Sequence, residues 1–331
     1  MQDAEGVTRM EEVDMADPTS PPWPSLDYAA WRDTRDTLHL WTQVVGKIRL
    51  RLTPWLNHSW HVPLYVTSRG LTTSPIAHGS GSFEIEFDFL EQVLDITVSD
   101  GRMRRLALRP QSVADFYAAV MAALAELGVA VVINETPCEI AAATAFSRDR
   151  IHSAYDADYA LRFWEVLLRT DSVFKRFRTG FIGKSSPVHF FWGSFDLAVT
   201  RFSGRRAPPF TAKIPGVSSA VMRDAYSHEV SSAGFWPGGG GTDFAAFYSY
   251  AYPTPAGFGE TPVKPAGAYF DPTLGEFLLP YDAVRTADDP DAALLAFLQS
   301  TYEAAARAAA WDRDALECAQ GRLGVPRVAA N

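Results

Sequence analysis

The sequence predicts an α+β protein, with largely antiparallel sheets flanked by about four long helices. Three observations predict this class. Short runs in which apolar and polar residues alternate are grouped between residues 60 and 108 and again between residues 187 and 281. Longer runs with helical spacing precede, separate and follow these groups. The second half repeats the element types of the first half without visible sequence repetition.

The first helix is predicted over residues 29–52, where apolar side chains recur at helical spacing opposite polar ones. The apolar positions are Leu38, Trp41, Val45, Ile48 and Leu52, and the polar positions are Arg35, Asp36, Gln43, Lys47 and Arg49. Because one face is apolar and the other polar, an amphipathic helix is expected. Three further helices are predicted by their caps and spacing, over residues 112–128, 157–178 and 289–307.

Strands are predicted wherever short apolar runs alternate or are bounded by turn residues. In the first half they are expected at 60–67, 83–88, 93–99 and 103–108, with a buried strand at 129–133. In the second half they are expected at 187–192, 195–202, 227–235, 244–252 and 276–281. Asp100-Gly101 is a hairpin signal, and the four glycines at 238–241 predict a flexible hairpin tip.

The chain has 331 residues, and a chain of this length is expected to form about two domains. Residues 1–22 are acidic and end in a proline cluster, so a disordered leader is expected there. No linker rich in glycine, serine or charge separates the halves that follow. Residues 23–331 are therefore expected to form a single composite domain, or two packed lobes at about 23–150 and 151–331.

Composition excludes several classes of protein. The net charge of −9 argues against nucleic-acid binding, and no apolar run is long enough to predict a membrane span. Two cysteines, Cys138 and Cys318, cannot form a disulfide framework, so a cytoplasmic location is expected. Gly183-Lys184-Ser185 lacks the first glycine of a phosphate-binding loop, and no motif specifies a cofactor.

Residues 175–206 carry seven basic side chains and one acidic side chain in an otherwise acidic protein. The basic residues are Lys175, Arg176, Arg178, Lys184, Arg201, Arg205 and Arg206, and the acid is Asp196. Positive charge among aromatic residues predicts a site for a small anionic molecule, such as a carboxylate or a phosphate ester. The alternative is a solvated helix end followed by basic loops.

The same segment contains a hairpin. Gly193-Ser194 fits a two-residue type II′ turn, which would pair Phe191 with Asp196 and His189 with Ala198. Alternation then places His189 and Asp196 on one face as diagonal neighbours. There the carboxylate could orient the imidazole and raise its pKa for acid–base catalysis. The alternatives are a structural His–Asp hydrogen bond, or an odd-numbered loop that separates the two residues.

Four segments carry a resemblance to a known family. They are GKSSPVHFFWGSFDLAVTRFSGR, NHSWHVPLYVTSRGLTTSPI, FSRDRIHSAYD and YSHEVSSAGFWPG. In these four segments the chain resembles an uncharacterised bacterial family that is known only as a domain of unknown function. The resemblance covers most of the chain from Trp23 onward. It implies no activity, because none is established for the family.

These segments place polar side chains in apolar, strand-like surroundings, and such residues often line a pocket. The candidate catalytic residues are His189, Asp196, His228 and Glu229. The candidate ligand-binding residues are Lys184, Arg201, Arg205, His61, Tyr65, His152, Tyr155, Asp156 and Trp236, with His58 and Arg69 as further contributors. A structural hydrogen bond is the alternative role for each residue taken alone.

Two functions from different classes remain open. One is an enzyme that acts on a small anionic metabolite by His/Asp general acid–base chemistry in a basic, aromatic-lined pocket. The other is a noncatalytic binding or regulatory protein that uses the same pocket. A metal site assembled across the fold is also left open, with ligands from His58, His61, His152, His189 and His228.

Overall fold

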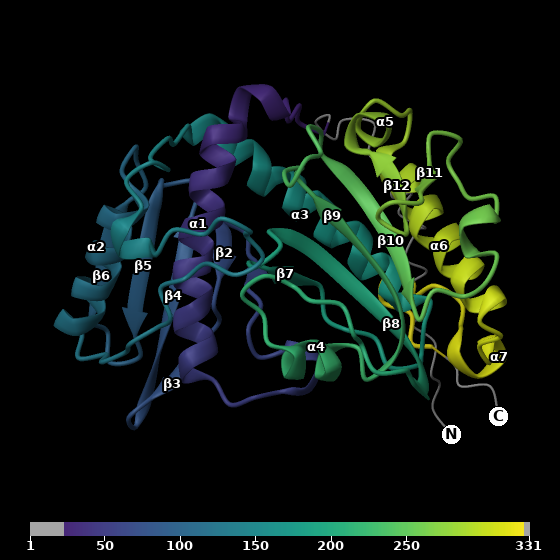
Figure 1. Ribbon diagram of the computed structural model, residues 1–331, viewed down its shortest axis with the longest axis horizontal. Helices are drawn as coiled ribbons and strands as arrows, with labels where there is room; N and C mark the ends of the chain where they lie inside the picture. Colours follow the sequence, from purple (N-terminus) through teal and green to yellow (C-terminus); the bar gives the residue numbers. More distant parts are fainter. Residues whose placement is uncertain (1–22, 328–331) are drawn as a thin grey trace, which may run out of the picture.

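Two six-stranded antiparallel sheets form the framework of the computed structural model, which describes residues 23–327 (Figure 1). The first sheet contains β1 (Tyr65–Val66), β2 (Gly70–Thr72), β3 (Ile76–His78), β4 (Gly81–Asp88), β5 (Val93–Val98) and β6 (Met103–Ala107). The second contains β7 (His189–Phe191), β8 (Asp196–Arg206), β9 (His228–Trp236), β10 (Ala246–Tyr252), β11 (Tyr269–Asp271) and β12 (Glu276–Pro280). The predicted α+β class with antiparallel sheets is confirmed.

The two sheets meet at one edge. Leu64, just before β1, exchanges two backbone hydrogen bonds with Phe190 of β7, at 2.9 and 3.0 Å. The side chains of both residues are fully buried. The edge strand of one sheet is therefore covered by the edge of the other, which removes an exposed row of unpaired backbone groups.

Helices cover the sheets. They are α1 (Tyr28–Leu52), α2 (Val113–Glu126), α3 (Ala157–Thr179), α4 (Ser219–Ala225), α5 (Tyr281–Arg285), α6 (Pro290–Ala308) and α7 (Arg313–Leu316). α2 packs on the first sheet, α3 and α6 pack against the second, and α1 lies between the sheets (Figure 1). Across residues 23–327, none of these helices is long and apolar enough to cross a membrane.

The helix α1 is present as predicted, but the prediction that one of its faces is exposed to solvent is wrong. Arg35, Gln43, Lys47 and Arg49 were placed on the polar face, yet all four are buried. A helix that lies between two sheets is covered on both sides, so its polar side chains face protein instead of water. Buried polar groups need hydrogen-bond partners, and Gln43 and Arg49 bond the carbonyl oxygens of Cys138 and His61, which lie outside the helix.

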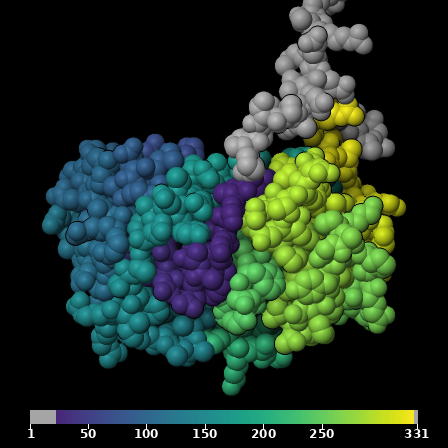
Figure 2. Space-filling view, turned by 90° about the horizontal axis from the view of Figure 1, so that it is seen from above, coloured from purple at the N-terminus to yellow at the C-terminus, as the bar shows by residue number. Residues whose placement is uncertain are grey.

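The apolar core runs through both halves of the chain. Trp31 of α1 packs against Phe163 of α3, and Trp41 of α1 stacks on Phe116 of α2, at ring-centroid distances of 5.2 and 4.6 Å. Buried apolar residues of both sheets form one continuous cluster. Figure 2 shows the same arrangement from above, with the purple N-terminal segment between the blue first half and the yellow-green last part of the chain. The division into one domain or two lobes stays a prediction.

Two strand predictions are wrong. Residues 129–133 form no strand; the Val129 amide donates to the Leu124 carbonyl oxygen at 2.8 Å, so this segment continues from the end of α2. In the predicted strand at 60–67, only residues 64–66 pair: Tyr65–Val66 with β2 and Leu64 with Phe190. The glycines at 238–241 do lie in the hairpin connection between β9 and β10. The expected leader, residues 1–22, lies outside the described residues.

Gly46 of α1 allows Trp192 to pack directly on the helix. A Cβ at Gly46 would overlap the Trp192 indole. In an exposed helix, replacing Gly by Ala stabilises by about 1 kcal/mol. Here we expect Gly46→Ala to lower the free energy of unfolding by about 1–3 kcal/mol, because the indole must leave its place. Urea denaturation measures the effect.

The matched control is Gly267→Ala, where the nearest atom to a new Cβ lies at an ordinary 3.5 Å. This variant should keep the wild-type midpoint or gain slightly. Equal midpoints for Gly46→Ala and the wild type would show that the indole has room to move.

Candidate functional site

The hairpin of β7 and β8 has the predicted register. Phe191 pairs with Asp196, Phe190 with Leu197, and His189 with Ala198. The loop has four residues, 192–195, instead of the predicted two, and the Phe195 amide donates to the Phe191 carbonyl oxygen at 2.8 Å. Because four is also an even number, the two strands present the expected faces. His189 and Asp196 therefore share a face.

The predicted contact between these two residues is wrong. Asp196 accepts hydrogen bonds from the Ser194 hydroxyl, at 2.5 Å, and from the Tyr248 hydroxyl. Within residues 23–327, neither ring nitrogen of His189 has a hydrogen-bond partner. Burial, followed by the charge of Arg49, lowers the pKa of His189 to about 3. His189 is therefore neutral at pH 7, and Asp196 does not raise its pKa.

β9 and β10 bring Tyr248 to Asp196. Ala198 pairs with Gly234, and Gly234 pairs with Tyr248, so the three lie in one row across the sheet. Because Gly234 has no side chain, the Tyr248 ring lies across it; a Cβ at Gly234 would overlap that ring. The small residues in the middle of the row leave the phenol free to reach the carboxylate of Asp196.

A second acid comes from the loop between α2 and α3. Glu139 lies against the turn at Gly193, where an added Cβ would overlap its carboxylate. The Gln43 amide nitrogen donates to the Cys138 carbonyl oxygen at 2.9 Å, and His39 bonds the Gly193 carbonyl oxygen at 2.9 Å. Two buried polar residues of α1 thus hold the loop and the turn together.

Three carboxyl groups form what we call the carboxyl cluster: Asp196, Glu139 and Glu276 of β12. Burial raises the pKa of Asp196 to about 6. Burial and the charge of Asp196 raise the pKa of Glu139 and of Glu276 to about 7. Neither glutamate side chain accepts a hydrogen bond from a described residue. Glu139 is exposed at the surface, whereas Asp196 is 6% exposed.

Hydroxyl groups surround the cluster. The Tyr226 and Tyr250 hydroxyls lie 2.9 Å apart, as do those of Thr200 and Ser232. Burial raises the pKa of Tyr226 to about 12, so this phenol keeps its proton at neutral pH. Such a face offers neutral donors and acceptors together with carboxyl groups that titrate near pH 7.

Basic residues from several segments meet at the other end of the same face. The Lys184 ammonium donates to His58 Nε2 at 2.6 Å and lies 5.0 Å from the Trp60 ring. His58 Nδ1 bonds the Ala225 carbonyl oxygen at 3.0 Å, and the His228 ring lies 5.9 Å from His58. Burial lowers the pKa of both His58 and Lys184.

The predicted anion site around Arg201 and Arg205 is wrong. Arg201 is 1% exposed, and its guanidinium carbon lies 3.5 Å from the centre of the Phe177 ring. Arg205 pairs with Glu229 at 2.7 Å and donates to the Ala309 carbonyl oxygen at 2.6 Å. Both arginines have structural partners, and Glu229 pairs with Arg205 instead of facing a ligand.

Most other candidates have structural partners outside this face. His152 bonds Asp149 at 2.7 Å, the Tyr155 hydroxyl donates to Gln92 at 2.6 Å, and the Asp156 carboxylate caps α3. His61 Nδ1 accepts from the Leu56 amide at 3.2 Å. Trp236 shares the face of Gly234 by alternation, but it lies at the opposite end of β9 from His228. The structure does not bring these residues together.

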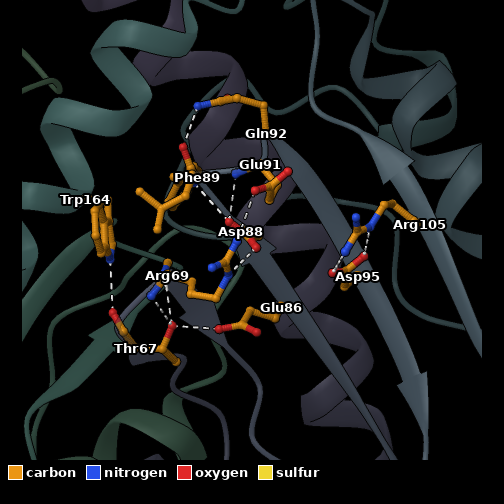
Figure 3. Close-up of polar contacts among 12 residues, drawn as sticks. Thr67, Arg69, Glu86, Asp88, Phe89, Glu91, Gln92, Asp95, Arg105 and Trp164 are labelled. Atoms are coloured by element: carbon orange, nitrogen blue, oxygen red, sulfur yellow. Dashed lines mark hydrogen bonds and ion pairs between the residues drawn. The ribbon is translucent and has the colours of Figure 1, made fainter. Parts of the chain in front are cut away.

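Arg69 belongs to a polar network on the first sheet. Its Nε donates to Asp88 at 2.5 Å, and Asp88 also accepts from the Glu91 amide at 3.0 Å (Figure 3). The nearby pair of Arg105 and Asp95 is held by two hydrogen bonds of 2.8 Å. This network fixes the turn after β4 and leaves Arg69 no role in the site.

The histidines do not form the metal site left open by the sequence. Only His58 and His228 come close, and in the part of the chain that the structure describes no three His, Cys, Asp or Glu side chains are grouped to hold a metal. Sequence reasoning missed Glu139, Glu276 and Tyr248. Their strands and loops are distant in sequence, and their only sequence signal was aromatic and acidic residues at alternate strand positions.

Comparison with known proteins gives one match. The model of a family described as "Family of unknown function (DUF5996)" matches residues 23–318. This confirms the resemblance to a domain of unknown function. No curated protein and no solved structure matches the chain.

Proposed function

The chain belongs to this family of unknown function, and we propose that it is an enzyme that moves protons on a small molecule bound against the β8–β10 face. The carboxyl cluster supplies the acid and the base. The observation that supports this proposal most strongly is that Glu139 and Glu276 have pKa values of about 7 and no hydrogen-bond partner among the described residues. General acid–base catalysis is most efficient when the pKa of the group lies near the working pH.

Two members of the carboxyl cluster differ in pKa, so one can act as the base and the other as the acid. The hydroxyls of Tyr248 and Ser194 donate to Asp196, which favours its ionised form, so Asp196 loses its proton at the lower pH. Glu139, which lacks such donors, keeps its proton to about pH 7. Between these values Asp196 is a base and Glu139 is an acid, and groups whose surroundings separate their pKa values divide acid and base work in this way.

This assignment replaces the predicted His/Asp pair. His189 cannot act as the base through Asp196, because the two do not bond and burial keeps the imidazole neutral. The noncatalytic alternative uses the same face only for binding. It differs in one respect: a binding protein needs the shape and hydrogen bonds of the cluster but not its titration.

The test incubates the protein with pooled metabolites in deuterated buffer and follows consumption or deuterium uptake by NMR and mass spectrometry. We expect at least one compound to change, with a rate that is highest near pH 6–7. Asp196→Asn and Glu139→Gln should each lower this rate by about 10²–10⁴-fold, the usual contribution of a general acid or base.

The control is Asp95→Asn, which removes a carboxylate paired with Arg105 on the first sheet and should leave the rate unchanged. A compound that raises the melting temperature of the wild type and of Asp196→Asn equally, with no chemical change in either, would instead establish the noncatalytic binding protein.

A further inference from the structure

Two buried polar side chains at the junction of the sheets lack partners. His189 is 1% exposed, and neither of its ring nitrogens bonds a described residue. Arg49 is 9% exposed; its Nε donates to the His61 carbonyl oxygen at 2.8 Å, while Nη1 is buried without a partner among residues 23–327. Buried polar groups are nearly always hydrogen-bonded, so these atoms point to a ligand.

The two residues lie against the same aromatic ring at the junction, that of Tyr65. Leu64 pairs with Phe190, which sets Tyr65 beside His189 on the face of the proposed active site; their ring centroids are 5.7 Å apart. The Arg49 guanidinium carbon lies 5.3 Å from the Tyr65 ring. The Trp60 ring lies 5.7 Å from His189 on another side. Aromatic rings thus surround the imidazole and the guanidinium.

The junction carries positive charge without a matching anion. Arg49 and Arg178 both act on His189 and lower its pKa, and neither arginine forms an ion pair with a described residue. Asp171 interacts electrostatically with Arg178, but it is already paired with Lys175 at 2.5 Å. Burying a guanidinium without an anion is costly, so an anion completes this arrangement.

We propose that the junction binds the carboxylate of the substrate between Arg49, Arg178 and His189. This inference rests on the proposed function and adds to it the class of substrate. The free donors are the two N–H groups of Arg49 Nη1, the buried Nε–H of Arg178 and one imidazole N–H. They match the roughly four lone-pair positions of a carboxylate. A phosphate, with three terminal oxygens and more charge, would leave acceptors unpaired.

The position of this subsite restricts the substrate further. His189 and Asp196 are diagonal neighbours across the hairpin, about 7–8 Å apart at the backbone. A carboxylate held at His189 therefore places atoms a few bonds away over Asp196 and Glu139. The substrate is a small carboxylic acid whose reacting centre lies several atoms from the carboxylate.

The experiment uses the full chain, labelled with ¹⁵N in histidine, and titrates it with sodium acetate or with acetamide as the neutral probe of the same shape. Acetate should shift the His189 ring signals in a saturable way and raise the melting temperature, whereas acetamide should do neither. Arg49→Gln and Arg178→Gln should each weaken acetate binding roughly tenfold, since each removes a charged hydrogen bond. Sodium phosphate should bind more weakly than acetate.

Arg105→Gln is the matched control, because it removes an arginine whose partner, Asp95, lies on the first sheet. Circular dichroism shows whether each variant folds. If a variant does not fold, the wild-type titration with acetate and acetamide still tests the subsite. Equal shifts with acetate and acetamide, or no shift with acetate at about 100 mM, would overturn the carboxylate subsite. Acetate binding in Asp196→Asn without turnover in any wild-type assay would retain the subsite and reject the proposed catalysis.

Discussion

Replacing Arg201 by alanine is expected to lower the free energy of unfolding by about 3–5 kcal/mol, as measured by urea denaturation. The guanidinium fills space between aromatic rings, 3.5 Å from the centre of Phe177 and 4.3 Å from that of Tyr302. It also donates to the Phe177 carbonyl oxygen at 2.5 Å. Alanine leaves a cavity and a carbonyl without its donor, both of which destabilise the folded state.

Arg201→Met separates volume from charge. Methionine fills most of the space, and it removes a buried cation whose Nε and Nη1 have no partner among the described residues. Because replacing buried charge by apolar volume is often neutral or stabilising, this variant should lose far less stability than Arg201→Ala. Wild-type stability in Arg201→Ala would mean that the residue is free, and an anion site at Arg201 would again be open.

The stability of Asp196→Asn relative to that of the wild type is expected to rise by about 2.5 kcal/mol between pH 4 and pH 8. Burial raises the folded-state pKa of Asp196 from 3.8 to about 6. The unfolded chain therefore loses this proton first as the pH rises. The contribution of Asp196 is fully present below pH 3.8 and is lost as the pH rises through about 6. Asparagine has no proton to lose.

The measurement is the difference in urea midpoint between variant and wild type at a series of pH values. His39 and His189 titrate in the opposite sense, since burial lowers the pKa of each to about 3 and stability is lost as the pH falls below 6.5. Because both proteins contain these histidines, the difference isolates Asp196. A pH-independent difference would show that the carboxylate is as well solvated in the folded state as in the unfolded one.

The predicted hairpin shows how much of the site is readable from sequence. Side-chain alternation and an even loop were enough to place His189 and Asp196 on one face, although the loop length was wrong. The same alternation places Arg201 with Leu197 and Val199 on the core face. The number of basic residues in 175–206 was considered without this alternation. Arg201 was therefore predicted to bind a ligand, whereas its guanidinium packs against the Phe177 ring.

Partners from distant elements could not be predicted in this way. Tyr248 reaches Asp196 because Gly234 separates them, and this depends on the register of three strands. The loop that carries Glu139 is held at Cys138 by Gln43 of α1, a residue that the helical spacing had assigned to the polar face. Local patterns determine the type of an element and the faces it presents. Which faces meet is decided by packing between segments more than fifty residues apart.

The central position of α1 also governs how the chain can fold during synthesis. Its His39 bonds a carbonyl 154 residues later, and Pro24, just before the helix, accepts from the Tyr281 hydroxyl 257 residues later. The first helix of the described residues is therefore synthesised long before the segments that it contacts. Contacts of such high separation slow folding, and until they form the nascent helix exposes apolar surface. We expect this protein to fold late and to need chaperone protection of its N-terminal half.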